Sequence, residues 1–172
     1  MQKLFNQYLT LHSKLKSKET NTAEIANILN ISEETARVII SRMLDEYMIY
    51  STKRGSYKIV KPKLWVSLNT LSLQNYPHIK EVVKELVLES EHIKAIILHG
   101  SRVRGDYRIE SDLDILVLSD IPLPHLKKKY DYPISIEVQL IDRYDKIYIR
   151  EAISEGEIIY GDKEEGLIKE IL

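Results

Sequence analysis

The chain has 172 residues, with 25 Lys or Arg against 26 Asp or Glu and a hydrophobic content of 44%. The length allows one domain or two small ones, and the composition favours a packed core over disorder. The charge balance excludes a uniformly basic nucleic-acid coat, and the absence of cysteine excludes disulfide scaffolds, zinc fingers, iron–sulfur centres and cysteine nucleophiles. We expect a cytoplasmic protein without a membrane segment, because no apolar run approaches the ~20 residues that span a bilayer and the first residues lack an apolar signal core.

Charge is distributed unevenly along the chain. Residues 1–70 carry 11 Lys or Arg and 6 Asp or Glu, whereas residues 71–172 carry 14 and 20. The split suggests two domains, a basic one that could approach a polyanion and an acidic one whose clustered carboxylates would suit a divalent metal. Ordinary scatter between two short segments is the alternative interpretation.

The first third of the chain has the pattern of three helices and a hairpin. Apolar residues at helical spacing predict a helix over residues 2–16, and residues 17–22 form a polar break. Asn21 and Ser32 are predicted N-caps of a short helix to about Leu29 and of a third helix over about 33–48. The expected buried stripe of the third helix consists of Val38, Ile39, Met43, Leu44 and Tyr47. Two β-prone runs, 49–52 and 57–60, flank a basic turn with a glycine, which is typical of a hairpin.

The run Thr22–Ser32, in this order of elements, resembles the first helix and turn of the winged helix-turn-helix family. We place such a domain at residues 1–62 and a connecting segment at 63–79, in which 64–68 could be a strand or the start of a helix. The resemblance implies contacts with double-stranded DNA from the third helix and from the wing. The candidate DNA-binding residues are Arg37, Ser41, Arg42, Lys53, Arg54 and Lys58. A protein-contact or dimer module is the alternative, because Glu33 and Glu34 would face the DNA.

Strands and helices mix in the second half, which predicts an α/β or α+β fold there, and we expect α+β for the whole chain. A helix is expected from Pro77 to about Glu89, followed by three apolar strands at 95–98, 113–118 and 134–141. The second of these strands is apolar on both faces, so we expect it to be central. The predicted elements that follow are a helix from about Arg143 to Ser154 capped by Asp142 and ended by Gly156, a short strand at 158–160 and a terminal helix at 163–172.

Three carboxylates and one glycine turn carry the predicted chemistry. Asp112 and Asp114 begin a strand two residues apart, so they share a face and repel each other unless a cation such as Mg²⁺ or Mn²⁺ lies between them. Alternation in the next strand puts Glu137 on a polar face. The turn at Gly100-Ser101 follows a strand, and its backbone could approach a phosphate. Together these residues predict a two-metal phosphoryl-transfer site.

Gly100-Ser101, ten further residues and then Asp112-Leu113-Asp114 resemble the signature of the DNA polymerase β-like nucleotidyltransferases, most closely the minimal nucleotidyltransferases. The resemblance covers about 80–162, and we place a small mixed-sheet nucleotidyltransferase domain at 80–172. Two departures are Glu137, where the family more often has Asp, and His99, where it usually has an aromatic residue such as Phe.

The resemblance implies an enzyme that moves a nucleoside monophosphate, with AMP from ATP expected, to an unidentified hydroxyl acceptor. It implies that Asp112 and Asp114 bind both metal ions, and that Glu137 binds the ion that activates the acceptor hydroxyl. The implied nucleotide-binding residues are Gly100, Ser101, Arg104, Gly105 and Ser111. Minimal nucleotidyltransferases often pair with a helical toxin, so a separate toxin-type protein is an expected partner, and the apolar face of helix 2–16 suits either a homodimer contact or the domain core.

Two other functions fit the same residues. One is a DNA-binding transcription regulator whose nucleotidyltransferase-like domain only senses a nucleotide. Three intact carboxylates argue against it, because a sensor does not need the third. The other is modification of a small molecule, as in aminoglycoside nucleotidyltransferases, for which the chain offers little room for an acceptor pocket.

Overall fold

The computed structural model describes residues 2–16, 18–70, 79–127, 130, 133–161 and 166–171. The chain divides into two compact units, Met1–Thr70 and Leu71–Leu172. The first unit therefore extends eight residues past the boundary at residue 62 that the sequence suggests. Among the described residues, no helix combines the length and the apolar character that crossing a membrane requires.

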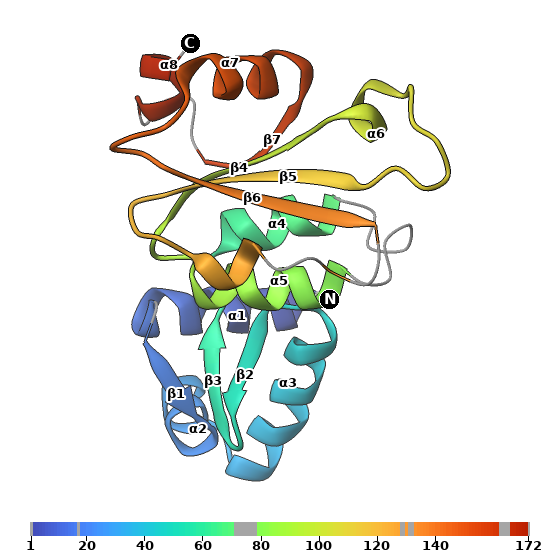
Figure 1. Ribbon diagram of the computed structural model, residues 1–172. Helices are drawn as coiled ribbons and strands as arrows, with labels where there is room; N and C mark the ends of the chain where they lie inside the picture. Colours follow the sequence, from blue (N-terminus) through green and yellow to red (C-terminus); the bar gives the residue numbers. More distant parts are fainter. Residues whose placement is uncertain are drawn as a thin grey trace. The chain divides into compact units, whose positions relative to one another are not determined.

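The first unit combines four helices with a three-stranded antiparallel sheet of order β1-β3-β2 (Figure 1). Its elements are α1 (Gln2–Leu15), β1 (Glu19–Asn21), α2 (Thr22–Leu29), α3 (Glu33–Asp45), β2 (Ile49–Lys53), β3 (Ser56–Ile59) and α4 (Pro62–Thr70). The predicted helices and hairpin are confirmed.

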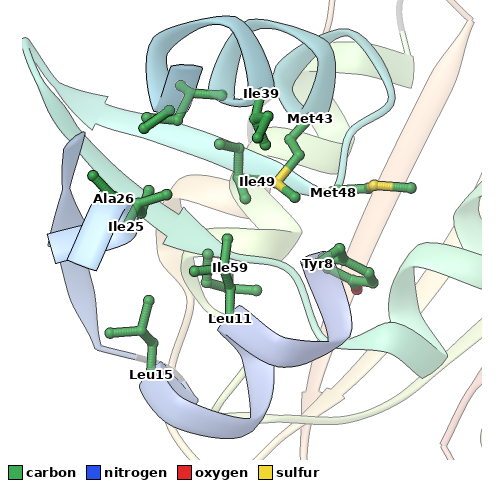
Figure 2. Close-up of a cluster of buried hydrophobic side chains, with 12 residues drawn as sticks. Tyr8, Leu11, Leu15, Ile25, Ala26, Ile39, Met43, Met48, Ile49 and Ile59 are labelled. Carbon is green, nitrogen blue, oxygen red and sulfur yellow. The ribbon is translucent and has the colours of Figure 1, made fainter. Parts of the chain in front are cut away.

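An apolar cluster from α1, α2, α3 and the hairpin forms the core of this unit (Figure 2). The Tyr8 hydroxyl in that core donates to the buried Val60 carbonyl at 2.7 Å. The ring of Trp65 on α4 lies 5.6 Å from that of Phe5 and 5.9 Å from that of Tyr8. The Trp65 indole N–H donates to the Glu46 carbonyl at 2.6 Å. This bond connects α4 to the end of α3 within the first unit.

Both predicted N-caps are present. The Asn21 side chain accepts from the Glu24 N–H at 2.9 Å, and the Ser32 hydroxyl accepts from the Thr35 N–H at 3.2 Å. The Glu24 carboxylate in turn accepts from the Thr20 hydroxyl at 2.7 Å. The bonds to Asn21 and Ser32 satisfy backbone donors that the first turn of a helix otherwise leaves without partners.

The structure corrects three local predictions in this unit. Residues 19–21 lie in the expected polar break but form β1, because their backbone pairs with β3. The third helix ends at Asp45 rather than 48, and Tyr47 beyond it adopts a left-handed φ of 55°. Val38, expected in the core, is 53% exposed, whereas Ala36 and Ile40 of the same helix are buried.

The second unit is built on a four-stranded sheet of order β6-β5-β4-β7 (Figure 1). Its elements are α5 (Ile79–Leu88), β4 (Ile93–His99), α6 (Ser101–Arg104), β5 (Leu113–Ser119), η1 (Pro124–Lys127), β6 (Ile134–Leu140), α7 (Lys146–Glu155), β7 (Glu157–Tyr160) and α8 (Leu167–Ile171). Strand β5 runs parallel to β6 and antiparallel to β4, so its predicted inner position is confirmed. Pro77 lies outside the described residues.

Helices α7 and α8 cover one face of this sheet. Ile149 and Ala152 of α7 pack with Ile97 of β4 and Leu116 of β5 in one buried cluster. Helix α7 begins three residues later than predicted, because residues after β6 first make a turn. Its N-cap is Asp145, not Asp142.

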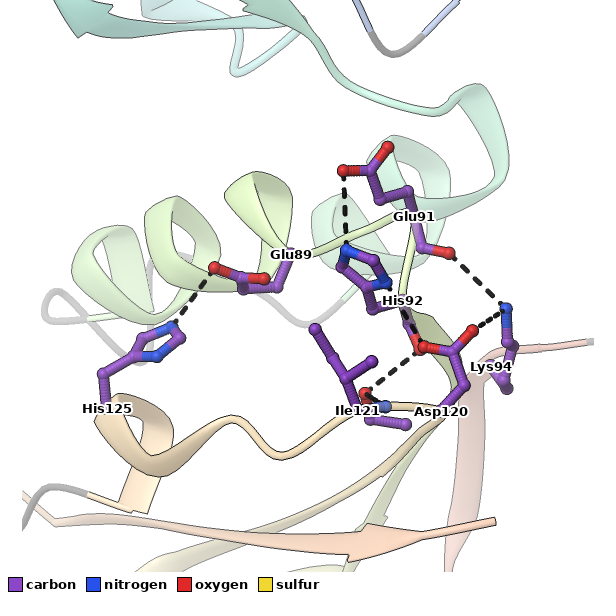
Figure 3. A network of polar contacts seen from close by, with 8 residues as sticks. Glu89, Glu91, His92, Lys94, Asp120, Ile121 and His125 are labelled. Carbon is purple, nitrogen blue, oxygen red and sulfur yellow. Dashed lines mark hydrogen bonds and ion pairs between the residues drawn. The ribbon is translucent and has the colours of Figure 1, made fainter. Parts of the chain in front are cut away.

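A polar network closes the end of the sheet where β4 begins and β5 stops (Figure 3). Lys94 lies 2.8 Å and His92 3.3 Å from the two oxygens of the Asp120 carboxylate. The hydrogen bond from Lys94 lowers the pKa of Asp120. His125 of η1 lies 3.6 Å from the Glu89 carboxylate at the end of α5. These contacts stabilise the C-terminal end of β5. Asp112 and Asp114 lie at the other end of that strand.

We expect Tyr8→Phe to destabilise the first unit by about 1–3 kcal/mol, because the buried Val60 carbonyl loses its donor. The free energy of unfolding is measured in urea by the fluorescence of Trp65, the chain's single tryptophan. Thr10→Ala on the same helix removes an exposed hydroxyl that donates to the Asn6 carbonyl, and should change stability by less than about 0.5 kcal/mol. Equal effects of the two substitutions would contradict the role of the buried bond.

Candidate active site

The turn from β4 into α6 is shaped by Gly100. Its backbone has φ 80° and ψ −170°, a conformation that is essentially restricted to glycine. A Cβ placed there would lie 2.0 Å from Oδ2 of Asp114. Glycine therefore lets the backbone of this turn approach the Asp114 carboxylate directly.

Helix α6 is a single turn that both predicted glycines delimit. The Gly100 carbonyl accepts from the N–H groups of Val103 and Arg104, each at 3.1 Å. Gly105 closes the turn at φ 85°, and its N–H donates to the Ser101 carbonyl at 2.9 Å. The Ser101 side chain is half-buried beside Gly100.

The loop between α6 and β5 is held by side chains of its own segment. Arg102 donates from Nε to the Ser111 carbonyl at 2.6 Å and from Nη2 to the Ile109 carbonyl at 3.3 Å. The Ser111 hydroxyl accepts from the Arg108 N–H at 2.9 Å. Ser111, which was predicted to bind nucleotide, thus stabilises the conformation of the loop that leads into Asp112.

Asp114 and Glu137 share one face of the sheet. Asp114 lies opposite His99 on β4 and Ser135 on β6, and Glu137 lies opposite Leu116 one step further along the same face. Burial raises the pKa of Asp114, and Asp112 adds to the rise, whereas His99 and Arg104 oppose it. A half-buried carboxylate beside a second carboxylate is an environment that a bound cation would relieve.

The donor set fits a hard divalent cation. Asp112, Asp114 and Glu137 offer the carboxylate oxygens that Mg²⁺ and Mn²⁺ prefer. Within the described ranges, no three His, Cys, Asp or Glu side chains lie close enough to hold an ion by themselves. Since Mg²⁺ is commonly held by one or two carboxylates together with substrate phosphates, the residues are compatible with an ion that arrives with a nucleotide.

His99 and Tyr148 complete the site beside these carboxylates. The Tyr148 hydroxyl lies 3.4 Å from Nε2 of His99, and the two rings meet edge to face at 5.8 Å. Burial lowers the pKa of His99, although Asp114 and Glu137 oppose this. Burial and the Glu137 carboxylate both raise the pKa of Tyr148. No local pattern marks Tyr148 in the sequence, because it reaches the site only through the packing of α7 on the sheet.

Arg104, another predicted nucleotide-binding residue, is paired within the chain. Its Nη1 lies 3.0 Å from Oε2 of Glu155, and its Nε lies 3.5 Å from Oδ2 of Asp106. These contacts join α6 to the end of α7. A phosphate that binds Arg104 would therefore compete with Glu155.

The residues predicted to bind DNA belong to α3 and the hairpin of the first unit. The α3 residues Arg37, Ser41 and Arg42 are exposed, as are the hairpin residues Lys53 and Arg54, whereas Lys58 is half-buried. Arg37 lies 3.6 Å from the Glu33 carboxylate, and Lys53 lies 3.6 Å from the Glu19 carboxylate.

Comparison with known proteins identifies the second unit. Residues 78–169 match the nucleotidyltransferase domain family. A Methanocaldococcus jannaschii protein named "Putative protein adenylyltransferase" is 37% identical over 89 residues, which are 49% of this chain and 80% of that protein.

Two solved structures show weaker likenesses. A toxin–antitoxin crystal structure with AMP-PNP is 18% identical, with a TM-score of 0.42 over 55% of this chain and 83% of that one. The toxin–antitoxin pair MntA-HepT is 17% identical, with a TM-score of 0.38 over 54% and 79%. Likenesses of this strength carry no weight for function.

We expect Gly100→Ala to abolish the binding of Mg²⁺ with ATP, because the new Cβ would collide with the Asp114 carboxylate. Gly166→Ala is the matched control in the same unit, since Gly166 also has a positive φ, of 91°, but no atom within 4 Å of an added Cβ. It should cost about 1–3 kcal/mol of stability through strain and leave ATP binding intact. Titration calorimetry with both variants measures the binding. Undiminished binding by Gly100→Ala would contradict the site described here.

Proposed function

Because the chain belongs to the nucleotidyltransferase domain family, and is a nucleotidyltransferase enzyme, we propose that it transfers AMP from ATP to a hydroxyl group of another protein. The main support is the closeness of Asp114 to the Gly100 turn, with Glu137 on the same face of the sheet and Asp112 two residues before Asp114. The name of the Methanocaldococcus jannaschii relative supports AMP as the group and protein as the acceptor. A separate toxin-type protein is the acceptor that the resemblance to minimal nucleotidyltransferases favours.

The proposed mechanism assigns one task to each residue. The acceptor oxygen forms a bond to the α-phosphorus while the bond from that phosphorus to the bridging oxygen of the β-phosphate breaks, and pyrophosphate leaves. Glu137 accepts the proton of the acceptor hydroxyl. Ser101 and the backbone of its turn hold the β- and γ-phosphates. Mg²⁺ or Mn²⁺, held by these carboxylates together with the phosphates of the nucleotide, would supply positive charge that offsets the developing negative charge.

Asp114→Asn should lower the rate of pyrophosphate release from ATP by about 10²–10³-fold, because one charge that organises the reacting phosphates is lost. Asp142→Asn is the control, since Asp142 is exposed and has no role in the site. Label in the α-phosphate of ATP should enter the acceptor protein, whereas label in the γ-phosphate should not.

The labelling result separates the competing functions. ATP binding without any transfer would contradict the proposed activity and favour the nucleotide-sensing regulator. Transfer of the α-label to a small molecule, with none in protein, would favour the aminoglycoside type of acceptor.

For the first unit we propose a winged helix-turn-helix module that binds double-stranded DNA. The supporting observation is its order of elements, in which α2, a turn and α3 precede the hairpin β2–β3. Exposed cations on α3 and at the hairpin give both parts a means of contacting phosphates. A homodimer through the first unit stays a prediction.

Lys53→Gln with Arg54→Gln should weaken DNA binding and reduce the slope of log K against log salt by about 1 per lost phosphate contact. Lys3→Gln with Lys14→Gln removes two exposed cations from α1 and should leave both quantities unchanged. Fluorescence anisotropy of a labelled duplex at several salt concentrations measures them. The same salt slope for the wild type and both double variants would contradict contact through the hairpin.

A further inference from the structure

Asp112 lies outside the strands that fix the other two carboxylates of the site. Asp114 and Glu137 belong to β5 and β6, where pairing with neighbouring strands sets the path of their backbone. Asp112 is exposed and precedes Leu113, the first residue of β5, so it stands at the end of the loop that follows α6. Ordering a loop costs conformational entropy. A carboxylate at the end of a loop can therefore meet an ion at a fixed place only if other contacts hold that loop.

The Arg102 guanidinium holds the end of this loop. Its Nε donates to the Ser111 carbonyl at 2.6 Å, and its Nη2 donates to the Ile109 carbonyl at 3.3 Å. The two carbonyls thus bind along one edge of the planar group, and its Cζ lies over the Tyr107 ring, 5.2 Å from the ring centre. Ser111 directly precedes Asp112 in the sequence. The contacts of Arg102 therefore fix the backbone one residue before the carboxylate.

The start of the loop is held by the neighbouring residue of the same helix. The Ser101 carbonyl accepts from the Asp106 N–H at 3.1 Å. Successive residues of α6 thus hold both ends of the loop, and contacts within the chain set the spacing between the candidate phosphate turn and Asp112. The partners of Arg102 are backbone carbonyls and a ring of this loop, whereas Arg104 pairs with side-chain carboxylates.

We propose that Arg102 is a positioning residue, which holds the loop 105–111 against α6 and so keeps Asp112 at the metal site without contacting the nucleotide. The inference rests on the role proposed above for Asp112. Two donors in one plane suit this task, because two carbonyls bound side by side fix the direction of the loop as well as its distance. Groups that orient metal ligands commonly change metal affinity by about 10–100-fold when they are replaced.

Hydrogen exchange tests the hold on the loop in the full-length protein without any ligand. In Arg102→Gln the N–H groups of Arg108 and Ser111, which bond within the loop, should exchange about 10-fold faster than in the wild type. Exchange in the buried strand β5 should stay at the wild-type level, which shows an intact fold. Arg108→Gln is the matched control, because it removes an exposed arginine side chain of the same loop and keeps the backbone N–H.

Manganese binding tests the consequence for the site. Electron paramagnetic resonance with a non-hydrolysable ATP analogue should show Mn²⁺ binding about 10-fold weaker in Arg102→Gln than in the wild type. The kcat for pyrophosphate release should fall at unchanged KM for ATP. Arg102→Lys keeps the charge but cannot bond both carbonyls from one plane, so it should lose as much Mn²⁺ affinity as Arg102→Gln. Arg108→Gln should bind Mn²⁺ as the wild type does.

A double-mutant cycle shows whether Arg102 acts through Asp112. In the background Asp112→Asn, residue 112 has no charge to bring to the ion. Adding Arg102→Gln there should change Mn²⁺ affinity by less than about 2-fold.

Three results would overturn the proposal. Unchanged exchange of the loop in Arg102→Gln would mean that the guanidinium does not hold it. Full Mn²⁺ affinity in Arg102→Lys, together with a raised KM for ATP in Arg102→Gln, would assign the arginine to a phosphate. Equal losses from Arg102→Gln in both backgrounds would exclude an action through Asp112. Failure of the proposed function itself is distinct, because wild-type protein would then bind no Mn²⁺ with the ATP analogue, while the difference in exchange would remain.

Discussion

The approach of the Gly100 turn to the Asp114 carboxylate is the constraint on which the second unit depends. Strand β4 must end beside the start of β5 for this contact, and their antiparallel pairing places His99 opposite Asp114. Only glycine permits the backbone conformation and leaves space for the carboxylate. The parallel partner β6 then brings Glu137 to the same face. Sheet order and site geometry are therefore set together.

The electrostatic character of the site follows from this crowding. Asp114 is half-buried next to Asp112, and its raised pKa expresses a charge that water solvates only partly. His99 shares the same surroundings, and its lowered pKa favours a neutral ring that contacts Tyr148 without adding a full positive charge. Tyr148 also packs against the apolar cluster of α7 and α8, so one side of the site adjoins a region of low dielectric constant.

Features fixed by neighbours in the sequence could be predicted, whereas features fixed by packing could not. Neighbouring residues in the sequence were enough to predict the caps at Asn21 and Ser32, the hairpin around Gly55 and the buried strand β5. Strand β1 could not be predicted in this way, because its three residues are held only by pairing with β3. The predicted start of α7 is three residues too early, because a turn follows β6. The signature that the chain shares with the nucleotidyltransferases points to Gly100 and Asp114 as site residues, and the structure places them close together. Tyr148 could not be found in this way, because it reaches His99 only through the packing of α7 on the sheet. The pairing of Arg104 with Glu155 spans 51 residues.

The ion pair between Arg104 and Glu155 has a consequence for ionic strength. If a triphosphate displaces Glu155 from Arg104, the guanidinium exchanges one anionic partner for another instead of acquiring its first. Dissolved salt screens the pair that is broken as well as the contact that is made, and the two effects partly cancel. Nucleotide affinity at this arginine should therefore depend less on salt than affinity at a cation that faces only water. The released Glu155 lies at the end of α7, directly before Gly156, so occupancy of the phosphate site would be transmitted to the junction between α7 and β7.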